Sequence, residues 1–199
     1  MKKIILLTAT MLTWSAAWAE PDTYRIDASH SFANWSIRHV ASKTSGTFND
    51  ITGQILIDRE HLENSSVEAK INVLSVNSGH AKRDDHIKKE EYLDAYRFGD
   101  MTFVSSKVEA KGADHGILTG TLTLHGIAKQ ISFPFKVLGF GADPWGGYRM
   151  GIEVHTSLKA SDYGFTWPLK ANAPVGDEIE ITLLIEGVLN NPPPKALQP

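Results

Sequence analysis

The eight histidines are the residues of this 199-residue chain that could most readily bind a metal or move a proton near neutral pH. Their spacing does not favour a metal site: His80 and His86 are six residues apart, and no HxxxH or HxH pair occurs. Serine and aspartate are common, but no G-x-S-x-G elbow marks a nucleophile. We therefore predict no catalytic residue and no metal ligand. A periplasmic hydrolase or metal-dependent enzyme that uses His30, His39 or His125 is kept as an alternative.

Two polar features could still meet the head group of a ligand. His39 shares the phase of Trp35 and Ile37 in an alternating run, so an inward imidazole could hydrogen-bond a quinone or amide head. The cluster Arg83–His86 opens a helical stretch and could also meet a head group. The simpler interpretation is structural, with Asp84 or Asp85 pairing with Arg83 or capping the helix, and His86 fixing the helix to the body of the protein.

That helical stretch, Ser75–Phe98, differs from the rest of the chain, which alternates apolar and polar residues. Asn77 and Ser78 are candidate N-caps because their side-chain oxygens can accept hydrogen bonds from the first free N–H groups of a helix. We predict one helix near His80–Lys88 and a second helical turn near Glu90–Tyr96. A single helical element among many strands is typical of a plug or lid on a barrel or sandwich.

Alternation of period two predicts strands over most of the remaining chain. Pro134 falls on the outward phase of its run, so we expect a sheet edge, a bulge or a kink there. Two of the strands, Gly46–Ile51 and Gly53–Asp58, are expected to pair with each other across Thr52-Gly53. The other expected strands are Tyr24–Asp27, Phe32–Val40, Val67–Val73, Met101–Glu109, Ile117–Leu124, Ile131–Val137, Ile152–Leu158 and Ile179–Leu189.

This pattern predicts an all-β fold, an eight-stranded antiparallel lipocalin-like barrel with a short helical cap. The interior of such a barrel can hold one small ligand, and strands of about ten residues give a height of roughly 25 Å once tilted. An apolar tunnel of that length suits an extended hydrocarbon chain, although the same side chains could simply fill the core. The residues predicted to bind the ligand are Trp35, Ile37, His39, Phe48, Ile71, Phe103, Phe133, Phe135, Phe165 and Trp167.

The N-terminus has the features of a secretory signal peptide. Lys2 and Lys3 precede an apolar run, Ile4–Ala16, and Ala17-Trp18-Ala19 fits the small-x-small cleavage pattern. The run is too short to span a membrane as a helix. We expect cleavage after Ala19 and a periplasmic protein.

The composition of the 180 residues after the expected cleavage site narrows the function further. The absence of cysteine from the chain excludes disulfides, cysteine–zinc sites and thiol catalysis, and it suits an oxidising periplasm. Removing Lys2 and Lys3 leaves 18 basic against 23 acidic residues, a net charge of −5, which argues against a nucleic-acid surface. We predict one domain over residues 20–190 and a proline-rich disordered tail over residues 191–199.

Taken in order, a set of short motifs resembles the YceI family of secreted, lipocalin-like lipid-binding proteins. The set covers nearly all of the chain after the signal peptide, and its order is more specific than any single motif. The motifs are His30-Ser31-Phe32, His39, Gly46-Thr47-Phe48, Gly53, Ser75-Val76, Arg83-Asp84, His86-Ile87, Gly120–Gly126, Asp143–Gly147, Tyr163-Gly164 and Val175-Gly176-Asp177.

The resemblance implies a barrel that holds an elongated apolar ligand: a polyisoprenoid such as a quinone tail, or a fatty acid or fatty amide. It implies no catalysis and no cofactor other than such a bound isoprenoid or fatty-chain lipid, and a homodimer is compatible with it. The chain departs from the family at Gly99, where proline is usual, at Ala128, where threonine is common, and at Ala160, where arginine often stands. The change at Ala160 puts recognition of the head group in doubt. A ligand-free stress or interaction protein is a further alternative.

Overall fold

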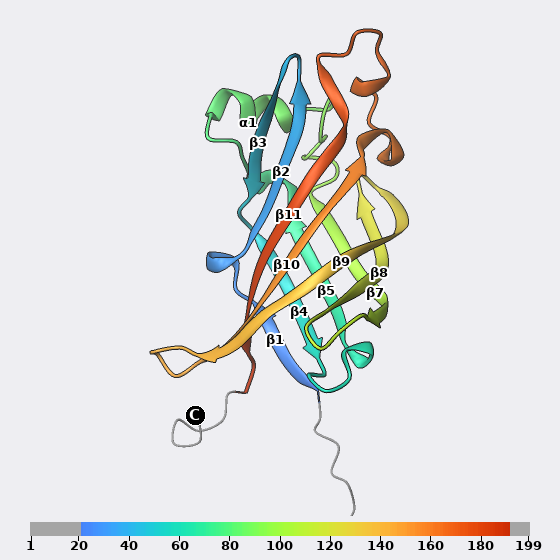
Figure 1. Cartoon of the computed structure of the whole chain (residues 1–199). Coiled ribbons are helices and arrows are strands. Elements are labelled where there is room, and N and C mark those ends of the chain that lie inside the picture. The colour runs from blue at the N-terminus through green and yellow to red at the C-terminus, as the bar shows by residue number, and fades with distance from the viewer. Residues whose placement is uncertain (1–20, 192–199) are drawn as a thin grey trace, which may run out of the picture.

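The computed structural model describes residues 21–191, so the predicted signal peptide and all of the predicted tail after Asn191 lie outside the described residues. Within the described residues there are eleven strands, one α-helix and five single turns of 3-10 helix (Figure 1). The strands are β1 (Asp22–Ile26), β2 (Phe32–His39), β3 (Ser42–Phe48), β4 (Ile51–Ile57), β5 (Ser66–Asn72), β6 (Val76–Asn77), β7 (Asp100–Ala110), β8 (His115–Leu124), β9 (Ile127–Ala142), β10 (Tyr148–Lys159) and β11 (Val175–Leu189). The helical elements are η1 (Ala28–His30), η2 (Leu62–Asn64), η3 (Val73–Ser75), α1 (Ala81–Ile87), η4 (Ala160–Tyr163) and η5 (Trp167–Leu169).

Eight of the described strands form a closed antiparallel ring. Their order is β1-β4-β5-β7-β8-β9-β10-β11, and pairing between β1 and β11 closes the ring. The period-two pattern places apolar side chains inside: in β10, Ile152 and Val154 are buried, whereas His155 is exposed. The predicted eight-stranded antiparallel barrel with one short helix is therefore confirmed.

The three other described strands extend one side of the ring upwards. β11 serves both parts, because Gly187–Leu189 pair with β1 while Val175–Leu184 pair with β2. β3 then pairs with β2, and the two residues of β6 pair with the end of β3. In the orientation of Figure 1, the ring forms the lower half of the molecule, and β2, β3 and the first half of β11 rise above it.

Two strands along from β2 in the sheet, the wall parts between β9 and β10. These strands pair from Tyr148 opposite Ala142 to Val154 opposite Phe135. Beyond that point, the described residues of β9 pair with β8 and those of β10 pair with β11. We call this place the seam, formed by residues 131–134 of β9 and 155–158 of β10. Pro134 is the first residue of β9 past the pairing, so its missing N–H leaves no gap in the β9–β10 hydrogen bonds.

Two segments cover the upper end, one on each side (Figure 1). The helical cap, residues 78–99, contains α1 and lies beside β3, whereas the aromatic loop, residues 160–174, contains η4 and η5 and follows the end of β10. Within residues 21–191, no helix has the length and apolar character needed to cross a bilayer.

The predicted pairing of Gly46–Ile51 with Gly53–Asp58 is wrong. Ile51–Ile57 is one strand, β4, and it pairs with β1 and β5. Gly53 lies inside this strand with φ +145°, and a Cβ atom there would stand 2.1 Å from the carbonyl oxygen of Glu68. Gly53 is therefore required for a close approach of β5 and not for a turn.

The helix α1 begins one residue after and ends one residue before the predicted range His80–Lys88. Its N-cap is His80, whose ring nitrogen accepts a hydrogen bond from the Arg83 N–H at 3.4 Å. The predicted caps serve the turn before the helix: the Asn77 side chain accepts from the Gly79 N–H at 2.9 Å, and the Ser78 N–H donates to Asp84.

The second helical turn predicted near Glu90–Tyr96 is also wrong. The chain reverses after α1, with the Leu93 N–H donating to the carbonyl oxygen of Ile87 and the Asp94 N–H to that of Lys89. Asp94 has φ +44°, which an α-helix does not allow. The reversal buries Ala95 completely, so tertiary packing outweighs the local helix propensity of this segment.

Candidate ligand-binding cavity

The barrel encloses a cavity of about 400 Å³. Its wall is built from the inward side chains of all eight ring strands together with β2, β3 and η2. The side chains low in the cavity, such as Ile55 and Val154, are buried, whereas Trp35 and Met101 are only half-buried although they line the interior. The cavity is bordered by side chains of both halves, since Val67 and Ile185 of the lower half are also half-buried and line it.

Six of the ten residues predicted to bind a ligand line this cavity. They come from five strands, which the barrel topology brings together although they are far apart in the sequence. The six are Trp35, Phe48, Ile71, Phe103, Phe133 and Phe135.

The other four lie elsewhere. Ile37 is buried above the cavity, where it pairs with Ile179, and Phe165 and Trp167 belong to a separate apolar cluster at the upper end. His39 is exposed beside the turn that follows β2. Its phase is that of Trp35, as predicted, but β2 continues past the top of the cavity, so the imidazole has no interior to face. The idea that His39 meets a ligand head inside the barrel is therefore wrong.

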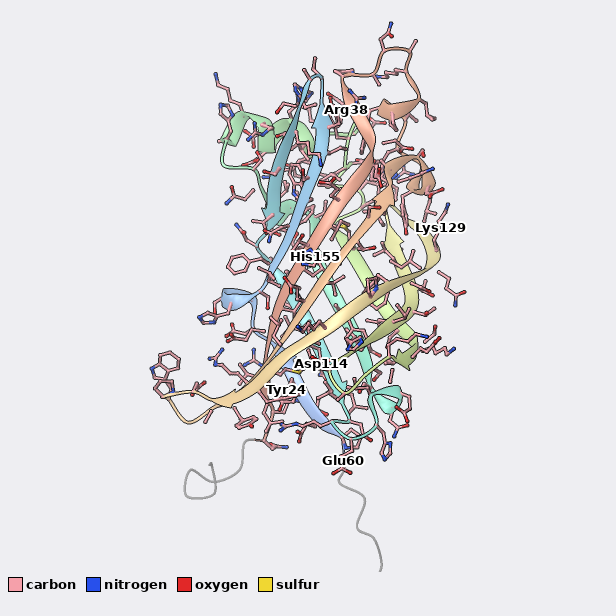
Figure 2. The ribbon with its side chains drawn as sticks, viewed as in Figure 1. Tyr24, Arg38, Glu60, Asp114, Lys129 and His155 are labelled. Atoms are coloured by element: carbon pink, nitrogen blue, oxygen red, sulfur yellow. The ribbon has the colours of Figure 1, made fainter. Side chains whose placement is uncertain are left out.

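At the lower end of the barrel, below Ile26 in β1, a group of residues gathers around Arg59, and we call this group the floor. The guanidinium group donates a hydrogen bond to the Tyr24 hydroxyl at 2.5 Å and pairs with Asp22 at 2.7 Å. It also lies 4.0 Å from the centre of the Phe140 ring and 5.3 Å from that of Tyr148. Burial raises the pKa of Tyr24 to about 12, although the nearby Arg59 charge opposes the shift. Figure 2 labels Tyr24 at this end of the barrel.

Sequence reasoning missed this floor. Tyr24 falls within a predicted strand, and its inward phase was available from the pattern. Arg59, however, comes from the loop after β4, and nothing in its neighbours indicates that its side chain turns under the barrel.

The upper end is covered by a chain of aromatic rings that joins the helical cap to the aromatic loop. Trp167 is fixed within it, because its indole N–H donates to the carbonyl oxygen of Gly176 at 3.1 Å. Ring centres of successive members are 4.4–5.5 Å apart, a range at which aromatic contacts are favourable. The chain runs through His86, Tyr92, Trp167, Phe165, His125 and Phe98.

The family model of the YceI-like domain matches residues 24–187. A UPF0312 protein of Yersinia enterocolitica, YE1254, is 36% identical over 190 residues, which cover 94% of this chain and 97% of the relative. The chain belongs to the YceI-like domain family.

Two solved structures share the fold of this YceI-like chain. BcnA of Burkholderia cenocepacia superposes with a TM-score of 0.73 at 24% identity, covering 81% of this chain and 98% of BcnA. A polyisoprenoid binding domain from Saccharophagus degradans gives a TM-score of 0.64 at 18% identity, covering 83% of this chain and 98% of that domain.

Ala160, one of the departures noted in the sequence, is completely buried in the upper cluster of this YceI-like chain. It begins η4, and its carbonyl oxygen accepts a hydrogen bond from the Phe165 N–H. A longer side chain at this position would have to displace the surrounding aromatic residues. The alanine is thus matched to the packing of the aromatic loop.

The polar cluster at the start of α1 stabilises the helical cap of the YceI-like fold. Asp84 accepts hydrogen bonds from both the N–H and the hydroxyl of Ser78, and Arg83 donates from Nε to that same hydroxyl at 2.7 Å. His86 lies 3.1 Å from a Glu91 carboxylate oxygen and packs edge-on against Tyr92. Asp84 therefore braces the helix start through Ser78, without pairing directly with Arg83, and His86 connects the helix to the aromatic chain.

A second polar group lies on the outside of the YceI-like barrel. Among the described residues, Asp27, His30 and Glu186 come close enough to share a cation, but Arg149 already donates to both carboxylates. Burial alone would raise the pKa of Asp27, yet hydrogen bonds from Ser29, His30 and Arg149 lower it well below its usual range. The Ser29 hydroxyl and Asp27 both approach the same His30 nitrogen, Nδ1, at 3.1 and 2.8 Å. A Ser–His–Asp triad needs one partner on each ring nitrogen, so this group does not form one.

Proposed function

We propose that this YceI-like protein binds and carries one long-chain apolar ligand inside the barrel without chemically changing it. The ligand is a polyisoprenoid, such as a quinone tail, or the chain of a fatty acid or fatty amide. The observation that carries the proposal is the cavity of about 400 Å³, whose lining within the described chain includes no charged residue. The name of the Saccharophagus degradans domain, a fold relative that binds polyisoprenoid, supports the same ligand class.

The physical basis of binding is the removal of apolar surface from water. At roughly 25 cal/mol per Å² of apolar area, burying a few hundred Å² of a hydrocarbon chain contributes several kcal/mol. The rigid wall of hydrogen-bonded strands keeps the cavity formed, so little ordering of the protein has to accompany binding. A chain without polar groups along its length fits this wall better than a polar or charged molecule of the same size.

We also propose that the protein acts in the periplasm after cleavage behind Ala19. The sequence of residues 1–19 and the absence of cysteine from the whole chain support this location. Intact mass of the protein from a periplasmic extract should correspond to a chain that starts at Glu20. A full-length mass, or recovery in the cytoplasmic fraction, would contradict the proposed location.

The ligand-binding proposal is tested by purifying the protein from its own cells without detergent. Native mass spectrometry should show a mass increment that is lost on organic extraction and that is identified in the extract as a chain lipid. A substitution that fills the cavity provides the matching loss: Ala69 lines the cavity and is half-buried, so Ala69→Leu should reduce lipid retention. Ala128→Leu makes the same change at an exposed position of β9 and should retain the native amount.

The thermal transition of both variants should be measured alongside, so that lost binding is not confused with lost folding. A protein that carries no lipid, and that fails to bind a fluorescent fatty-acid probe after extraction, would contradict the carrier function. Equal retention by Ala69→Leu and the native chain would show that the ligand lies outside the cavity.

A further inference from the structure

Thr156 is a polar residue on the inward phase of an otherwise apolar strand. In β10, Ile152, Val154, Thr156 and Leu158 all line the cavity. Thr156 lies opposite Ile181 of β11, which in turn lies opposite Trp35 of β2. Since residues opposite one another in a sheet share a face, Thr156 and Trp35 lie at the same level of the cavity, two strands apart.

Both residues have a hydrogen-bonding group without a partner. Within the described part of the chain, the Thr156 hydroxyl makes no hydrogen bond, and the buried indole N–H of Trp35 has none either. A buried polar group left unpaired costs about 1–3 kcal/mol, and native proteins rarely leave one without a reason. This cost falls on Trp35, whose N–H is buried. The Thr156 hydroxyl faces the cavity and is not among the buried unpaired groups, so it is open to a partner that is not part of the folded chain.

The remaining polar residues around the cavity are turned or bonded away from it. The Ser132 hydroxyl bonds that of Thr119, and the Ser157 hydroxyl donates to Glu178. The Ser65 hydroxyl accepts a hydrogen bond from a backbone N–H in the loop before it. Asn34 and Thr102 lie on the outward phase of their strands, each one residue before an inward side chain, Trp35 and Phe103 respectively. Among the residues that line the cavity, Thr156 and Trp35 are thus the ones with a polar group on the inward phase of their strands. The Trp35 ring lies against Gly46 of β3, on the side of β2 away from β10.

The seam adds backbone groups at the same level. β10 loses its partner β9 after Val154, and Thr156 follows two residues later. The backbone groups of residues 155–158 that would have bonded β9 have no strand partner among the described residues on that side. Ile131 and Phe133 of β9 and Leu158 of β10 line the cavity here, so the cavity extends to the seam.

We propose that Thr156, with the neighbouring seam backbone, binds an uncharged oxygen-bearing group of the ligand, a carbonyl or a hydroxyl. This inference rests on the carrier function proposed above and adds a point of chemical selectivity to it. The cavity wall offers no charged residue within the described chain, so an ionised carboxylate or phosphate at this level would be desolvated without compensation. The ligand therefore has a neutral polar group at the level of the seam, and its hydrocarbon part extends towards the floor.

The test compares ligands that differ only in their polar group. A long-chain methyl ketone, the alkane of the same length and the corresponding carboxylate are measured by displacement of a fluorescent apolar probe from delipidated protein. The native protein should bind the ketone on the order of tenfold more tightly than the alkane, which is the effect of one or two added hydrogen bonds. The carboxylate should bind more weakly than the ketone at neutral pH and approach it as the pH falls and the acid becomes neutral.

Thr156→Val keeps the shape of the side chain and removes the hydroxyl, and Trp35→Phe keeps an aromatic ring and removes the N–H. Thr156→Val should abolish most of the difference between ketone and alkane while leaving alkane affinity and thermal stability at or above the native level. Trp35→Phe should leave the difference unchanged, because the indole ring lies on the β3 side of β2. The control is Thr182→Val on β11, whose hydroxyl bonds His155 on the outer face of the barrel. Figure 2 labels His155 on that face.

Two results would overturn the inference while leaving the carrier function intact: equal affinity for ketone and alkane in the native protein, or an unchanged preference in Thr156→Val. Failure of all three ligands to displace the probe would overturn both proposals.

Discussion

The lower and upper halves of the barrel use the same alternating strands but differ in how their interiors are filled. In the lower half, eight strands close into a ring, and Tyr24, Ile55 and Met150 are at most 3% exposed. In the upper half, the sheet parts at the seam, and Trp35 and Met101 remain half-buried around free volume. The comparison shows that one strand pattern can close completely at one end of a cavity and part at the other.

The difference follows from where hydrogen bonding between strands stops. A closed ring leaves no free edge, so a continuous wall encloses its inward side chains and the cavity between them. Past Val154, β9 and β10 go to separate partners, and the widened upper end is covered by two segments instead of by strands. We infer that stability comes mainly from the lower half, whereas ligand exchange takes place through the upper half. Three predictions test this division.

The largest expected effect is a contrast between two methionine deletions. Met150 is 1% exposed in the lower half, so Met150→Ala should lower the free energy of unfolding by about 2–5 kcal/mol. Met101 borders the free volume and has fewer contacts to lose, so Met101→Ala should cost roughly 1 kcal/mol or less. Urea unfolding monitored by circular dichroism measures both changes. Equal costs would show that the halves are packed alike.

The next effect concerns the aromatic chain over the upper end. Tyr92 contacts both His86 and Trp167, and each aromatic contact contributes about 0.5–1.5 kcal/mol. Tyr92→Ala should therefore speed ligand release by about tenfold in stopped-flow displacement, because loss of about 1.4 kcal/mol from the closed state gives that factor. Tyr96→Ala is the control in the same segment, since Tyr96 is 82% exposed. Equal release rates in the two variants would argue against exchange through this end.

The smallest effect is a pH dependence confined to the floor. Burial raises the pKa of Tyr24 to about 12 from the ordinary value of 10.0, so the folded protein holds the phenol proton more tightly than the unfolded chain does. The stabilising contribution is complete below pH 10 and is lost as the pH rises through 12. Tyr24→Phe should flatten the stability profile over this alkaline range. If the free energy of unfolding of Tyr24→Phe falls with pH as steeply as in the native protein, the phenol of Tyr24 is not the source of the pH dependence.

Much of the fold could be predicted from the sequence because alternation reports directly on which side chains face inwards. Phe133 and Phe135 are examples: their phase in a regular strand was sufficient to place both in the cavity wall. The helical cap was located for a similar reason, since its composition breaks the alternating pattern. Phase alone, however, does not say where a wall ends, and His39 was misplaced because β2 runs past the cavity.

The errors arose where distant parts of the chain decide the local structure. A glycine such as Gly53 is typical of a turn, but here the close approach of β5 requires a glycine inside a strand. The segment after α1 has helical propensity, but it reverses to bury Ala95. Arg59 closes the floor through contacts with residues from three other segments, which no local pattern could indicate. The sequence placed Thr156 in a strand, but only the structure shows that its hydroxyl has no hydrogen-bond partner within the described chain.

The Arg59 floor has a consequence for the direction of transfer. Under the proposed carrier function, the floor makes the lower end the less favourable exit, so the last part of a ligand to enter would be the first to leave. A flexible hydrocarbon would then be loaded tail first and handed on head first. Whatever receives the cargo must accordingly grasp its polar end before the rest can follow.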